Sequence, residues 1–108
     1  MPLTDGPRTY ILRGKTPVRC DDRLEFARWF ERVNRRVALD RIGDVEVSTV
    51  FLGVDHNLSG EGPPLLFETA TARGDEWDIR ERYPTWAEAE AGHRRWCYLL
   101  RETLGSEA

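Results

Sequence analysis

The chain has 108 residues, of which 40% are hydrophobic and 32% are charged, and its formal net charge is −3. This composition excludes a disordered chain, and the length suits a single domain over residues 1–108 with one modest core. The small negative charge gives no general attraction to nucleic acid or anionic membranes, and no apolar run approaches the ~20 residues of a membrane span.

The segment 1–7 contains two prolines and a glycine, which predicts a loose arm before the folded domain. It lacks the basic and apolar parts of a signal peptide, so we expect a cytoplasmic protein. Two short strands are predicted at residues 10–12 and 17–20. The cysteines, Cys20 and Cys97, belong to no metal-ligand spacing and are expected to be reduced thiols.

A first helix is predicted to begin at Asp22, which fits the N-cap, with Glu25 completing a pair that resembles a capping box. Apolar residues recur with helical spacing and should form a buried face. They are Phe26, Trp29, Phe30, Val33 and Val37.

Arginines fall on the opposite side of this predicted helix: Arg28, Arg32, Arg35 and Arg36. Such a face can bind the phosphates of a nucleic acid or nucleotide, or an acidic partner. The alternative is a solvated face with local ion pairs, such as Glu31 with Arg35.

The middle of the chain predicts antiparallel strands separated by turn residues. The segment 37–42 ends the helix and enters a strand, and further strands are predicted at 45–52, 65–71 and 77–83. Gly43-Asp44 gives a tight turn, and the Gly/Pro-rich loop 53–64 joins the two central strands as a hairpin.

A capping box of Thr85 and Glu88 predicts a second helix that runs to Leu104. The elements together predict an α+β domain: an antiparallel sheet of four or more strands with two helices packed on one face. Its expected core is Phe26, Trp29, Phe30, Val33, Val47, Phe51, Phe67, Ala89, Trp96 and Leu100.

The pair Asp55-His56 is the first candidate for chemistry. A histidine beside a carboxylate can act as a base or bind a metal, and Glu68 on the next strand can add an oxygen ligand. Alternatively, Asp55, His56 and Asn57 bind backbone groups of their own loop and shape a surface for a partner.

His93 is the second candidate, on the apolar face of the second helix, where a histidine is usually a hydrogen-bonded core residue. A carboxylate reaching it from Asp40, Asp55 or Glu68 would favour a site instead. Cys20 or Cys97 can also be considered as its partner in a Cys–His pair.

Trp77 and Tyr98 have no clear place in the predicted core. Exposed aromatic side chains are enriched at protein–protein interfaces, and partial burial under the termini is the alternative. The sequence contains no P-loop, no Gly-rich phosphate loop and no zinc-finger spacing, so no cofactor and no catalytic residue is expected.

Several short motifs occur in this order: Lys15-Thr16-Pro17-Val18, Ala27-Arg28-Trp29-Phe30, Ser48-Thr49-Val50-Phe51-Leu52-Gly53, Asp55-His56, Leu66-Phe67-Glu68-Thr69 and Thr85-Trp86 with Glu88-Ala89. Across residues 9–96 the chain resembles a family of small, mostly uncharacterised proteins of phages and prophages. The resemblance implies an accessory protein of a mobile element in a bacterial host. Small acidic phage proteins of this kind resemble inhibitors of host systems, including anti-CRISPR and other anti-defence proteins.

Three hypotheses follow from the residues and the resemblance. The leading one is a non-enzymatic module that binds a host or phage protein. The second is a small metal-dependent or acid/base enzyme that uses Asp55 and His56, and the third is nucleic-acid or nucleotide binding by the face of Arg28, Arg32 and Arg35. The oligomeric state stays open.

Overall fold

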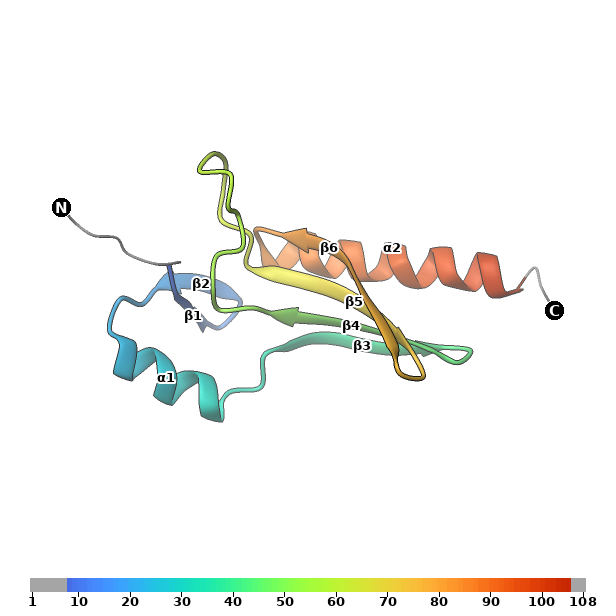
Figure 1. The fold of residues 1–108 in the computed structure, drawn as a ribbon, viewed down its shortest axis with the longest axis horizontal. Helices are drawn as coiled ribbons and strands as arrows, with labels where there is room; N and C mark the ends of the chain where they lie inside the picture. The colour runs from blue at the N-terminus through green and yellow to red at the C-terminus, as the bar shows by residue number, and fades with distance from the viewer. Residues whose placement is uncertain (1–7, 106–108) are drawn as a thin grey trace.

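The computed structural model describes residues 8–105, so the predicted arm at residues 1–7 lies outside the described residues. The described elements are β1 (Tyr10–Arg13), β2 (Thr16–Arg19), α1 (Arg23–Arg32), β3 (Arg36–Ile42), β4 (Val45–Phe51), β5 (Phe67–Arg73), β6 (Glu76–Tyr83) and α2 (Trp86–Gly105) (Figure 1). Within residues 8–105, no helix is long and apolar enough to cross a membrane.

The strands form two antiparallel sheets. Strands β3 to β6 make a four-stranded sheet in chain order, and β1 and β2 form a separate hairpin. The predicted central hairpin is confirmed, because β4 and β5 pair along their length, with Thr49 opposite Thr69. The predicted α+β class with an antiparallel sheet is likewise confirmed.

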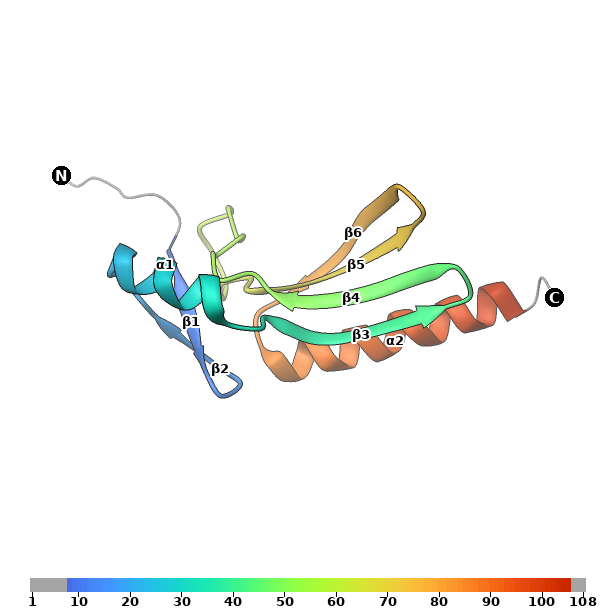
Figure 2. The same cartoon turned by 90° about the horizontal axis from the view of Figure 1, so that it is seen from below.

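The helix α2 runs along one face of the four-stranded sheet, and no described helix lies along the other face (Figure 2). The helix α1 lies beside β1, at one end of the molecule. Its Trp29 meets Phe51 of β4 edge-on, with ring centroids 5.8 Å apart, and the ring of Phe67 lies 5.2 Å from that of Phe51. Trp86 of α2 then meets Phe67 at 6.0 Å, so aromatic contacts connect both helices through the sheet.

The helix α1 is shorter than the sequence predicts. It ends at Arg32, and the backbone is already extended at Val33 (φ −92°, ψ 149°). The reason is tertiary: the carbonyl of Arg35 accepts a hydrogen bond from the amide of Phe51, so this segment joins β4 instead of continuing the helix. The prediction that the helix continues to Val37 is therefore wrong.

The apolar face of α1 is also less buried than predicted, since no residue of α1 is fully buried. Phe26, Trp29 and Phe30 are half-buried because α1 contacts the hairpin and the end of β4 but not the breadth of the sheet. Phe26 and Phe30 sit against Gly53, where an added Cβ would lie 3.0 Å from the Phe30 ring. Gly53 therefore allows the close approach of α1.

The core lies between the sheet and α2, in two clusters. Phe51, Leu66, Phe67, Tyr83 and Ala89 form one, and Ile42, Val47 and Cys97 form the other. The predicted burial of Val47, Phe51, Phe67 and Ala89 is confirmed. Trp96 and Leu100 pack against the second cluster and are partly buried, as Val33 is, so these three lie at the margin of the predicted core.

The N-cap of α1 gives a first testable prediction. The carboxylate of Asp22 accepts hydrogen bonds from the amides of Leu24 and Glu25, both at 3.0 Å. Asp22→Ala should lower the free energy of unfolding by about 1 kcal/mol, because two amides lose their acceptor. Chemical denaturation measures this, with Glu31→Ala as the control, for which a change within about 0.5 kcal/mol is expected. Equal effects of the two substitutions would contradict the capping role.

Candidate functional site

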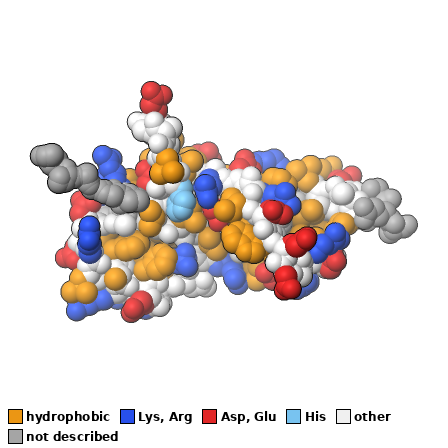
Figure 3. Space-filling model, in the orientation of Figure 1, with side chains coloured by type: hydrophobic (Ala, Val, Ile, Leu, Met, Phe, Trp, Pro, Cys, Tyr) orange, Lys and Arg blue, Asp and Glu red, His pale blue; other side chains and the backbone are white. Residues whose placement is uncertain are grey.

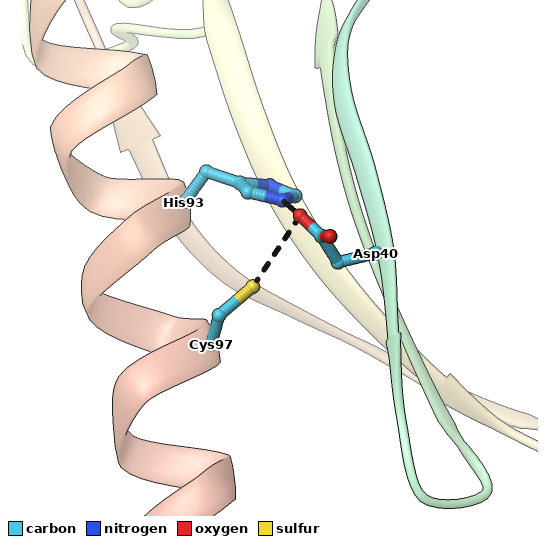
Figure 4. Close-up of side chains that lie close together, drawn as sticks. All are labelled: Asp40, His93 and Cys97. Carbon is cyan, nitrogen blue, oxygen red and sulfur yellow. Dashed lines mark hydrogen bonds and ion pairs between the residues drawn. The ribbon is translucent and has the colours of Figure 1, made fainter.

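Three side chains that can ligate a metal meet at the edge between β3 and α2 (Figure 4). His93 and Cys97 are one turn apart on α2, so both side chains lie on the same face of the helix. Asp40 reaches them from β3. Its Oδ2 lies 2.8 Å from His93 Nε2 and 3.7 Å from Cys97 Sγ.

The other ring nitrogen of His93 begins a buried chain of hydroxyl groups. Nδ1 lies 2.7 Å from Thr49 Oγ1 on β4, which lies 2.6 Å from Thr69 Oγ1 on β5. Tyr83 of β6 donates its hydroxyl proton to Thr69 at 2.9 Å. The chain therefore crosses beneath α2 from β4 to β6, and Asp40 of β3 lies on the other side of the His93 ring.

Glu81 lies at the far end of this chain. Its Oε1 is 3.2 Å from the hydroxyl of Tyr83, and it accepts hydrogen bonds from Trp96 Nε1 at 3.1 Å and Arg95 at 2.8 Å. Burial alone would raise the pKa of Glu81, but the hydrogen bonds from Trp96 and Arg95 outweigh it and leave that pKa below its ordinary value. Glu81 is thus an ionised acceptor at neutral pH.

The order Asp40, His93, Thr49 has the connectivity of a hydrolase triad, but Thr49 has no exposed surface. A nucleophile must contact its substrate, and Thr49 is enclosed by the sheet and α2. Burial and the nearby Asp40 carboxylate raise the pKa of the Cys97 thiol, which is therefore protonated and a poor nucleophile at neutral pH. The arrangement suits the binding of a ligand better than nucleophilic catalysis.

The loop that carries Asp55 and His56 is stabilised by hydrogen bonds between its side chains and its backbone. Asp55 Oδ1 accepts hydrogen bonds from the amides of Asn57 and Leu65 at 2.8 and 2.9 Å. The Nδ1–H of His56 donates to the carbonyl of Val54 at 2.8 Å. The side-chain amide of Asn57 donates hydrogen bonds to the carbonyls of Glu61 and Pro63. The prediction that these residues bind backbone groups of their own loop is confirmed.

The alternative metal site of Asp55, His56 and Glu68 does not form. Glu68 pairs with Arg82 at 2.9 Å, and its carboxylate is largely buried by the pairing. Within residues 8–105, the group of Asp40, His93 and Cys97 is the one set of three such side chains whose ligand atoms lie within 4.8 Å of one another. An open hollow of about 450 Å³ lies beside Asp55 and Asn57 of the loop. Arg8 and Tyr10 also line this hollow.

The predicted arginine face divides in the structure. Arg28 and Arg32 are exposed on α1, around a shallow hollow of about 180 Å³ that Asp22 and Glu25 share. Arg35 lies beyond the end of the helix, where it donates to the carbonyl of Phe51 at 2.9 Å and covers the ring of Phe30. The expected common face is therefore wrong, and the mixed charges around Arg28 do not favour a phosphate.

The exposed aromatic residues lie on different surfaces. Trp77 is 61% exposed and stands opposite Ala72, on the sheet face away from α2. Tyr98 is 59% exposed on α2 itself, beside Leu99. Their predicted exposure is confirmed, but they do not form one patch.

The uncovered side of the four-stranded sheet, which we call the open sheet face, carries three cross-strand rows. The middle row has large apolar residues on the edge strands and small residues on the two central strands. The two rows that flank it contain charged residues. The rows are Leu39–Ser48–Ala70–Ile79, Arg41–Glu46–Ala72–Trp77 and Arg36–Val50–Glu68–Arg82. Figure 3 shows hydrophobic side chains over the middle of the sheet on this side, with charged groups towards the hairpin ends.

Sequence reasoning left open which of Asp40, Asp55 and Glu68 reaches His93, and the structure selects Asp40. It missed the open sheet face. The spacing of His93 and Cys97 on one helix face is visible in the sequence, but Asp40 is 53 residues from His93 along the chain. For the open sheet face, the sequence offers one indication, which is the alternation of Trp77 and Ile79 with charged residues. It could not show that Leu39, from another strand, shares a row with Ile79.

Comparison with protein families, with curated proteins and with solved structures finds no match for this chain. The fold and the geometry define an α+β domain with one covered and one open sheet face. The resemblance to phage proteins stays a prediction.

Proposed function

We propose that this chain is a non-enzymatic binding module that receives an amphipathic helix of a protein partner on the open sheet face. The observation that carries the proposal is the pattern of side-chain sizes across that face. Small residues, Ser48 and Ala70, occupy the two central strands, and the larger Leu39 and Ile79 occupy the edge strands.

The dimensions favour a helix as the occupant. Neighbouring strands lie ~4.8 Å apart, so the edge strands β3 and β6 are separated by roughly 14 Å. A helix with its side chains is about 10–12 Å wide and fits between the two larger edge residues. The opposite face of the same sheet already packs a helix, α2.

The exposed apolar side chains supply the driving force. Leu39, Ile79 and Trp77 are 42%, 46% and 61% exposed, which is an unfavourable surface for a chain that stays alone in water. Glu46 and Arg41 flank the row on one side, and the pair of Glu68 with Arg82 flanks it on the other. A partner helix should therefore carry an apolar stripe bordered by charges of both signs.

The resemblance adds a biological context to this proposal. It would place the partner among host or phage proteins, and an anti-CRISPR or other anti-defence role is the specific form of the hypothesis. In that role the module would act by occupying a helix that the host protein needs.

Affinity capture from a bacterial lysate tests the proposal with matched variants. Trp77→Ala should weaken binding of the captured protein by tenfold or more, as aromatic anchors do at interfaces. Ala70→Glu should abolish binding, because it places a charge in the centre of the small row. Tyr98→Ala, which alters an equally exposed aromatic side chain on α2, is the control and should bind normally.

The segment of the captured partner that binds should be identified by hydrogen exchange, and it should be helical. Capture that survives Ala70→Glu, or that Tyr98→Ala removes instead, would refute the open sheet face as the site. Self-association of the wild-type chain that Ala70→Glu abolishes would show that a second copy is the occupant, and would also contradict the proposal.

A further inference from the structure

We propose that Asp40, His93 and Cys97 form a binding site for a divalent metal ion of the zinc class. The three ligand atoms, a carboxylate oxygen, an imidazole nitrogen and a thiol sulfur, lie within 4.8 Å of one another. Zinc and cobalt(II) favour this mixture of donors in tetrahedral geometry. The site lies on the α2 side of the sheet, so it does not depend on the proposed function.

The observed distances are close to those that an ion requires. Bond lengths of about 2.0–2.3 Å place neighbouring tetrahedral ligand atoms roughly 3.3–3.7 Å apart. Asp40 Oδ2 and Cys97 Sγ already lie 3.7 Å apart, and Asp40 Oδ2 and His93 Nε2 lie 2.8 Å apart. The second distance must increase by roughly half an ångström, and the separation of His93 Nε2 and Cys97 Sγ, which is within 4.8 Å, must come to roughly 3.5 Å. The Asp40 side chain is 48% exposed on an edge strand and is free to make that shift.

The imidazole of His93 is held in place by a second hydrogen bond. A histidine that binds metal through Nε2 must carry its proton on Nδ1, and that proton needs an acceptor. Thr49 Oγ1 lies 2.7 Å from Nδ1 and can accept it. Thr49 then donates its own hydroxyl proton to Thr69 Oγ1, which lies 2.6 Å away.

In the metal-free protein, the hydrogen bonds of His93 form with the imidazole in its other tautomer. Nε2–H then donates to Asp40, Nδ1 accepts from Thr49, and the donations run from Tyr83 through Thr69 to Thr49. Thr49 therefore has a partner for its hydroxyl in both states: it donates to His93 in the metal-free protein, and it accepts from His93 when the ion is bound. On binding, bonds form from the ion to Oδ2, Nε2 and Sγ, the imidazole proton transfers to Nδ1, and the thiol proton is released to solvent.

Titration of the metal-free 108-residue chain with Co²⁺ and with Zn²⁺ tests the site. We expect one equivalent of Co²⁺ to bind and to produce the charge-transfer absorption of a cobalt–thiolate bond, and Zn²⁺ to displace it. Cys97→Ser should remove the absorption and weaken Zn²⁺ binding at least 100-fold. Asp40→Asn should weaken it at least tenfold without disturbing the core, because that side chain is half-exposed.

The chain supplies its own matched controls, since it contains two cysteines and two histidines. Cys20→Ser and His56→Ala should leave the affinity and the absorption unchanged. Thr49→Val should weaken binding about 10- to 100-fold while every ligand is retained, as expected for loss of the hydrogen bond that orients a ligating histidine. Circular dichroism verifies that each variant is folded.

The proposal is wrong if the folded wild-type protein binds neither ion at millimolar concentration. It is also wrong if Cys20→Ser abolishes the absorption, or if Cys97→Ser and Asp40→Asn, both folded, bind Zn²⁺ as tightly as the wild type.

Discussion

Gly92→Ala is expected to lower the free energy of unfolding by up to about 2 kcal/mol, although alanine normally stabilises a helix. Gly92 lies inside α2 and is buried against Tyr83 of β6. A Cβ at this position would lie 2.3 Å from both Cε1 and Oη of the Tyr83 ring, far inside van der Waals contact. Either the ring or the helix must move to accommodate the methyl group.

Neither movement is easy, because both groups are held by other contacts. Tyr83 is 4% exposed, and its hydroxyl bonds Thr69 in the buried chain. Displacing α2 would separate His93, one residue further along, from Thr49. Overpacking of this kind costs about 1–3 kcal/mol or more, which exceeds the ~1 kcal/mol that alanine gains over glycine in a helix.

Denaturant unfolding of Gly92→Ala measures the effect. The control is Ala87→Gly on the exposed side of α2, which should cost about 1 kcal/mol by the ordinary order of helix propensities. The two variants therefore test opposite preferences in one helix. A Gly92→Ala protein that is more stable than the wild type would show that α2 does not pack as closely on Tyr83 as described.

The second large effect is an alkaline loss of stability that depends on Tyr83. Burial raises the pKa of this phenol from 10.0 to about 12 in the folded protein. Below pH ~10 the phenol is protonated in both states, so its contribution to stability is complete. Between the unfolded and folded pKa values the unfolded chain loses the proton first, and the contribution falls as the pH rises.

A shift of this size corresponds to about 3 kcal/mol, lost progressively from pH ~10 to ~12. The free energy of unfolding should be measured across this range for the wild type and for Tyr83→Phe. Tyr83→Phe should fall less steeply, although it starts lower by about 1 kcal/mol because it lacks the bond to Thr69.

The control for other titrating groups is Tyr98→Phe, which removes an exposed phenol and should follow the wild-type curve. Parallel curves for the wild type and Tyr83→Phe above pH ~10 would contradict the enclosed position of the Tyr83 hydroxyl.

Local structure can be predicted from the sequence where short-range patterns are strong. Thr85 and Glu88 predicted the start of α2, and the amide of Glu88 does bond the Thr85 hydroxyl at 3.1 Å. The alternation in β4 predicted a buried face with Val47 and Phe51, and both are fully buried. Asp55 and Asn57 were predicted to bind their own loop, because Asx side chains reach backbone groups a few residues away.

Long-range contacts fix where α1 ends, which surface stays open and which residues meet His93. The apolar spacing from Phe26 to Val37 fits a longer helix, but the backbone of Arg35 and Arg36 pairs with β4 instead. An alternating strand shows which residues share a face, but not whether a second layer covers it, so the exposure of Ile79 was undetermined. Asp40 meets His93 because β3 and α2 are adjacent across the edge of the sheet, and a contact between residues so far apart in the chain leaves no local pattern in the sequence.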